Sequence, residues 1–193
     1  MSQTTLDIKE PGLNVLPPGV ERHTVNAGGL TGLQIFPDDE IEIINDEGNQ
    51  ICEVICFNKD GKSELGILNL KENCKESFIK EILKKKNESS FVTNLQLKKR
   101  NLDINKSKSS LLFDNKTPNG ETIKIKSKDK CYVIFSAPQN DMLVSEQNPS
   151  SDLTIFIKRA KIVNDKELSI IPDPIFEPNY EKNIDRETSI SSS

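Results

Sequence analysis

The sequence is poor in the residues on which many enzymes and nucleic-acid-binding proteins depend. Its 193 residues include no Trp, two Tyr and one His. So few aromatic side chains argue against a base-stacking platform for single-stranded nucleic acid. The net charge of −4 argues against contact with a phosphate backbone, which requires clustered positive charge. We therefore expect no nucleic-acid partner.

Long apolar runs are also lacking. No stretch approaches the roughly 20 apolar residues that cross a bilayer. The opening residues, MSQTTLDIKEPG, lack the basic and apolar regions of a secretory signal. The four cysteines show neither CxxC spacing nor the density of a secreted disulfide scaffold: Cys52, Cys56, Cys74 and Cys131. These features predict a cytoplasmic protein with reduced thiols and no membrane partner.

What the chain does have is a series of short β-type runs separated by turn residues. The runs lie within 11–37 and at 40–44, 50–57, 63–70, 110–114, 121–126, 131–138 and 153–162. NDEG, between 40–44 and 50–57, favours a β-hairpin, and the turns within 110–137 favour a β-meander. These patterns predict a mainly β (α+β) fold, a β-sandwich or barrel-like domain.

One segment breaks the β pattern. In LKENCKESFIKEILKKK the apolar residues recur at helical spacing, which predicts one amphipathic helix near 71–86. The polar stretch that follows, 87–110, holds a short element around 91–97 in otherwise exposed chain. Residues 169–193 are rich in Pro and Ser and have no period. We expect a single β-rich module over 1–168 and a linker or tail over 169–193.

The run ICEVICFN contains the residues with the most chemical interest. With period two, Cys52 and Cys56 share one strand face, and Glu53 lies on the other among apolar side chains. A carboxylate in that setting is a candidate general acid or base, or a structurally paired acid. Cys52 and Cys56 are candidate metal ligands, although free cysteine is more often a small buried hydrophobe and structural zinc usually has four ligands.

Other chemical candidates are weaker. The single histidine, His23, lies in an alternating segment, as surface or strand-edge residues often do. Gly28 and Gly29 lack the strand and helix context of a dinucleotide-binding loop and indicate a turn. Asn140 and Asp141 follow a strong strand, where loops often present ligand contacts, and they are candidate binding residues beside the alternative of an ordinary capped loop.

The segment EGNQICEVICFN is similar to the core motif G-x-Q-x-x-D-x-x-x-F-N of the urea carboxylase-associated family, which includes subunits of carboxyguanidine deiminase. Four positions fit the motif: Gly48, Gln50, Phe57 and Asn58. Glu53 stands where the family usually has Asp. Over roughly residues 10 to 178, the chain resembles the N-terminal module of proteins in which such modules precede a glycine-cleavage T-protein-like, tetrahydrofolate-dependent aminomethyltransferase.

This resemblance implies a β-rich accessory or interaction module that is not catalytic alone. The chain would hold no cofactor, and tetrahydrofolate would enter only through an absent fused or partner domain. Its partner would be an aminomethyltransferase-like catalytic domain, with aminomethyltransferase or demethylase activity, or a second module of the same type. Gln50 and Asn58 become candidate binding residues. The alternative is a hydrolase or deiminase for a small urea- or guanidine-derived C–N substrate, with Glu53 as acid or base.

Overall fold

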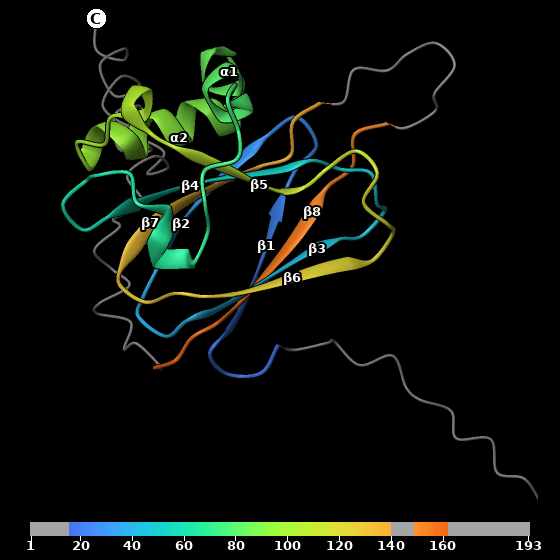
Figure 1. The fold of residues 1–193 in the computed structure, drawn as a ribbon, viewed down its shortest axis with the longest axis horizontal. Helices are drawn as coiled ribbons and strands as arrows, with labels where there is room; N and C mark the ends of the chain where they lie inside the picture. Colours follow the sequence, from blue (N-terminus) through green and yellow to red (C-terminus); the bar gives the residue numbers. More distant parts are fainter. Residues whose placement is uncertain (1–15, 140–148, 162–193) are drawn as a thin grey trace, which may run out of the picture. The chain divides into compact units, whose positions relative to one another are not determined.

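The computed structural model describes residues 16–139 and 149–161 as two packed antiparallel sheets with helices beside one of them (Figure 1). The strands are β1 (Val20–Val25), β2 (Leu30–Ile35), β3 (Glu40–Asn45), β4 (Cys52–Asn58), β5 (Ser109–Phe113), β6 (Glu121–Lys126), β7 (Cys131–Ser136) and β8 (Leu153–Lys158). One sheet has the order β1-β8-β3-β6 and the other the order β2-β7-β4-β5. This is the strand arrangement of an eight-stranded jelly roll. The predicted mainly β sandwich is confirmed, whereas the predicted tail, 169–193, lies outside the described residues.

The predicted hairpin between 40–44 and 50–57 is wrong, although both segments are strands. β3 pairs with β6 and β8, and β4 pairs with β5 and β7, so the two strands lie in different sheets. The Asn45 carbonyl accepts hydrogen bonds from the backbone N–H groups of Gly48 and Gly120. The connection is therefore fastened to the loop before β6 and crosses to the second sheet.

The predicted meander over 110–137 is wrong for the same reason. β5 pairs with β4, β6 pairs with β3, and β7 lies between β2 and β4. The segment 63–70 is not a strand: it holds a 3₁₀ helix, η1 (Leu65–Leu68), with three of its four residues buried. Local sequence located most strands correctly, but apart from β4 and β5 each strand is followed by a strand of the other sheet.

The predicted helix near 71–86 is shorter than expected and is followed by a second one. α1 spans Phe78–Lys84 and α2 spans Glu88–Lys99, with a short 3₁₀ helix, η2 (Ile104–Lys106), after them. The Ser77 side chain accepts a hydrogen bond from Lys80 N and so caps α1. The Asn87 side chain accepts a hydrogen bond from Ser90 N and so caps the start of α2. In α2, Phe91 is 64% exposed, so its apolar residues do not follow a single buried stripe.

β4 is buried on both faces. Cys52, Val54 and Cys56 belong to the core between the two sheets. Ile55 and Phe57 belong to a second core, which the helices cover (Figure 1). Within the described residues, no helix has the length and apolar character needed to cross a membrane.

A cluster of charged side chains ties together the ends of several strands. The Arg159 guanidinium donates through Nε to Glu21 Oε1 at 2.7 Å and through Nη1 to Asp39 Oδ2 at 2.6 Å. Asp39 is 1% exposed and also accepts from Phe36 N and Ala160 N. Glu21 accepts a further hydrogen bond from His23. This cluster joins β1, the turn before β3 and the end of β8.

The Glu21 carboxylate predicts a loss of stability in acid. Its hydrogen bond with His23, and next its contacts with Arg159, lower its pKa from 4.5 to about 2, against the opposing effect of burial. The lowered pKa stabilises the fold above pH 4.5, and this contribution disappears as the pH falls from about 4.5 to about 2. Because the side chain is 31% exposed, we expect about 2 kcal/mol rather than the full value of the shift.

The measurement is urea unfolding of the native chain and of Glu21→Gln at a series of pH values. The variant should be less stable near neutral pH and should lose less stability between pH 5 and pH 2. The control, Glu42→Gln, removes an exposed ion pair with Lys124 and should change the acid dependence far less. Parallel pH profiles for the native chain and Glu21→Gln would contradict this account.

Candidate functional site

Glu53 holds the start of α1 against the sheet. Its side chain is fully buried, and Oε2 accepts a hydrogen bond from the backbone N–H of Ile79 at 2.7 Å. A carboxylate beside the first turn of a helix also meets the positive end of the helix dipole. Oε1 is buried and has no hydrogen-bond partner among the described residues. The proposed general acid or base is thus placed beneath the helices as a structural anchor.

Both the nitrogen and the oxygen of the Gln50 side-chain amide form hydrogen bonds. Nε2 donates to the carbonyl oxygens of Ile51 at 3.0 Å and Pro138 at 2.9 Å. Oε1 accepts from Ser151 N at 2.8 Å, and the Gln50 carbonyl accepts from Asn45 Nδ2. The residue is fully buried and connects the β3–β4 crossing, the end of β7 and the segment before β8. These contacts leave its side chain no hydrogen-bonding group facing solvent.

Asn58 closes the turn after β4. Its Oδ1 accepts from the backbone N–H groups of Asp60 and Lys62, and its Nδ2 donates to Glu64 at 2.7 Å. Asn140 and Asp141, the other two predicted binding residues, lie outside the described residues. The structure therefore gives Asn58 a turn-forming role.

The remaining motif positions are explained by folding as well. Gly48 has φ +73°, and a Cβ there would lie 2.7 Å from the backbone nitrogen of Asn119. Only glycine fits this close approach of two loops without strain. Phe57 is 1% exposed and packs in the core beneath the helices. All five matched or near-matched motif positions thus have a structural role: Gly48, Gln50, Glu53, Phe57 and Asn58.

Cys52 and Cys56 fill space between the two sheets. Both are fully buried. Burial, and secondarily the Glu53 charge, raises the pKa of Cys52. A hydrogen bond between Cys56 and Cys131, followed by burial, raises the pKa of Cys56, and the same bond lowers that of Cys131. Across residues 16–139 and 149–161, no three His, Cys, Asp or Glu side chains are grouped so as to hold a metal ion.

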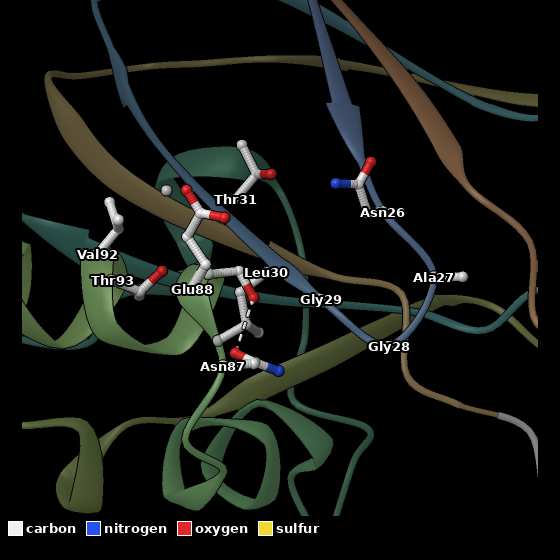
Figure 2. Close-up of a pocket in the computed structure, with 12 residues that line it drawn as sticks. Asn26, Ala27, Gly28, Gly29, Leu30, Thr31, Asn87, Glu88, Val92 and Thr93 are labelled. Carbon is white, nitrogen blue, oxygen red and sulfur yellow. Dashed lines mark hydrogen bonds between the residues drawn. The ribbon is translucent and has the colours of Figure 1, made fainter.

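A pocket lies at a place that the sequence did not identify. It has a volume of about 530 Å³ and separates the turn between β1 and β2 from the first half of α2 (Figure 2). Its lining is Asn26, Ala27, Gly28, Gly29, Leu30, Thr31, Gly32, Asn87, Glu88, Ser89, Val92 and Thr93. The helix-start pattern in NESS, an Asn followed by an acid, was the available sequence signal for its α2 side.

A second hollow, of about 660 Å³, lies over the face of β3, β6 and β8 that carries Glu42, Lys124 and Phe156. The Lys124 ammonium lies 3.3 Å from Glu42, so these charges are already paired. Neither pocket is lined by Gln50 or Glu53. Gln50 and Glu53 therefore lie outside both of these hollows.

Comparison with known proteins gives one informative match. No protein-family model matches the chain. Over 171 residues, 89% of its length, the chain is 30% identical to the trimethylamine-oxide aldolase of Ruegeria pomeroyi. It is a distant relative of one part of that enzyme. The aligned segment covers only 22% of the aldolase, so the chain spans about a fifth of the relative that it matches.

Replacement of Glu53 tests its role as an anchor. Glu53→Ala leaves the buried Ile79 N–H without an acceptor, and we expect it to reduce the free energy of unfolding by about 2–4 kcal/mol. Glu53→Gln keeps a carbonyl oxygen that can accept from that N–H, so it should reduce the free energy of unfolding by less. Urea denaturation measures both, and equal stabilities of Glu53→Ala and the native chain would show that the hydrogen bond does not hold the helix.

The cysteines should differ sharply in reactivity. Cys74 is partly exposed, whereas Cys52, Cys56 and Cys131 are buried. With a thiol reagent such as dithionitrobenzoate, the native chain should release the equivalent of one thiol quickly, and Cys74→Ser should abolish that fast phase. In denaturant all four thiols should react. Fast labelling of Cys52 or Cys56 in the folded chain, located by peptide mass spectrometry, would contradict the buried placement.

Proposed function

We propose that the chain is a β-rich accessory module of a larger one-carbon enzyme and contributes structure and interaction rather than turnover. In this proposal it is a urea carboxylase-associated type of module, over residues 1–168, acting in the cytoplasm. Its partner is an aminomethyltransferase-like catalytic domain or a second module of the same type. Tetrahydrofolate, where it is used, binds to that partner and not to this chain.

One observation carries the proposal: the candidate acid or base, Glu53, and the candidate binding residue Gln50 are both buried and hydrogen-bonded to the backbone. Glu53 is fully buried and accepts a helix N–H, and the Gln50 amide bonds to three backbone groups. A general acid or base must reach the proton that it transfers, within hydrogen-bond distance or through one water. Glu53 lines neither of the two pockets described above, so it does not meet that requirement.

The extent of the sequence match supports the same proposal. The chain aligns along 89% of its length with a segment that makes up 22% of the trimethylamine-oxide aldolase. A jelly roll of this size is a common scaffold for many functions, so its presence does not by itself imply chemistry. We infer that turnover belongs to the regions of such enzymes that this chain does not match.

The first test asks whether the chain turns over substrate alone. The purified full chain is incubated with trimethylamine N-oxide, and the methyl signal of the substrate is followed by proton NMR. We expect no loss of signal with this chain and a steady loss with the Ruegeria pomeroyi aldolase as positive control. Turnover of this substrate, or of a urea or guanidine derivative, that disappears in Glu53→Gln would overturn the proposal in favour of an enzyme.

The second test concerns the partner. The chain is tagged at its natural locus and purified, and the recovered polypeptides are sequenced by mass spectrometry. We expect a polypeptide similar to the unmatched part of the aldolase, either continuous with the chain or bound to it. Recovery of the chain without any such sequence would count against the module hypothesis.

A further inference from the structure

The pocket beside α2 is bounded by two backbone segments that approach each other closely. One is the turn with Gly28 and Gly29, and the other is the first turn of α2 (Figure 2). A Cβ on Gly29 would lie 3.0 Å from the carbonyl oxygen of Asn26 and 3.4 Å from Ser89 Oγ. A side chain at this position would therefore crowd the turn and extend toward Ser89. Glycine keeps this end of the pocket open.

Thr93 presents an unused hydroxyl to the pocket. The residue is 3% exposed, and it lines the pocket between Val92 and Glu88 (Figure 2). A threonine inside a helix often bonds to the carbonyl three or four residues earlier. Thr93 makes no such bond, and its hydroxyl has no hydrogen-bond partner within the described chain. The hydroxyl oxygen reaches the open space of the pocket, where a ligand hydroxyl can bond to it.

The first turn of α2 adds free donors and a free acceptor. The Asn87 side chain caps Ser90 N and accepts from the Ser89 hydroxyl. The backbone N–H groups of Glu88 and Ser89 have no partner in the described part of the molecule, as is normal for the first residues of a helix. The Glu88 carboxylate forms no ion pair with a described residue. Donors and acceptors thus lie next to each other at one wall.

The charges of this wall restrict what it binds. The Glu88 carboxylate repels an anion, and the positive end of the α2 dipole opposes a cation. No aromatic residue lines the pocket, so it lacks the ring faces that enclose a quaternary ammonium group. Hydroxyl groups both donate and accept, and they complement a wall that offers both kinds of partner. The lining favours a neutral molecule with several hydroxyl groups.

We propose that the pocket between the β1–β2 turn and α2 binds a neutral polyhydroxylated small molecule, a monosaccharide or a cyclitol, through Thr93 and the first turn of α2. The ligand hydroxyls donate to Glu88 and Thr93 and accept from the Glu88 and Ser89 amides. A volume of about 530 Å³ accommodates a single sugar ring. Binding here is independent of the accessory role proposed above.

The test is a titration of the full chain, labelled with ¹⁵N, followed by amide NMR. The probes are D-glucose, D-galactose, D-mannose and myo-inositol, with inorganic phosphate and trimethylamine N-oxide as contrasting ligands. At least one neutral polyol should shift the amide signals of Gly29, Glu88 and Ser89 in a saturable manner. The two contrasting ligands should not. A sugar response without an inositol response, or the reverse, identifies which of the two kinds of polyol the site prefers.

Two variants make the test specific. Thr93→Val keeps the side-chain shape but removes the hydroxyl, and it should weaken polyol binding about tenfold. The matched control, Thr122→Val, alters a threonine on β6 away from the pocket and should bind the polyol like the native chain.

Glu88→Gln changes an exposed residue and should leave the fold intact. It should weaken polyol binding and allow phosphate to shift the same amide signals. The proposal is overturned if no probe polyol binds, if phosphate or trimethylamine N-oxide binds the native chain more tightly, or if both variants bind the polyol unchanged.

Discussion

The fold depends on satisfying the backbone where the chain crosses between its two sheets. In this jelly roll almost every strand is followed by a strand of the other sheet, so the chain repeatedly leaves a hydrogen-bonded ladder. Buried N–H and C=O groups at such crossings need partners. Gln50 supplies them for three segments at once, through Ile51, Pro138 and Ser151. A shorter or apolar side chain at this position leaves several buried groups unpaired, which is why an amide of this length suits the crossing.

The sequence predicted those features of the fold that depend on neighbouring residues. It did not predict those that depend on residues far apart along the chain. Strand positions depend on local alternation and turn residues, and most were located correctly. Strand pairing depends on contacts such as Gln50 with Ser151, which are 101 residues apart. The turn NDEG is compatible with a hairpin and with a crossing, because a local turn does not specify which sheet receives the next strand. In the structure β3 pairs with β6 and β8, and β4 pairs with β5 and β7, so the turn belongs to a crossing.

The candidate site was predictable to a similar degree. An acid among apolar neighbours on one strand face correctly marked Glu53 as a residue with an unusual environment. Its partner, the Ile79 N–H, lies 26 residues away and belongs to a helix whose start the apolar period placed too early. The sequence analysis did not identify Thr93 as a candidate site residue, because the residue lies in a polar stretch that was predicted to be mostly exposed. Its burial results from packing of α2 on β2, which local pattern does not encode.

These observations change what the motif in residues 48–58 implies. A motif shared with an enzyme argues for shared chemistry only where its residues have no other reason to be present. Here Gly48 fits a positive φ against a neighbouring loop, Gln50 joins two crossings, and Glu53 anchors a helix. Each of these three residues therefore has a structural role. The 30% identity to part of an aldolase therefore indicates a distant relation, and these motif residues do not by themselves argue for shared chemistry.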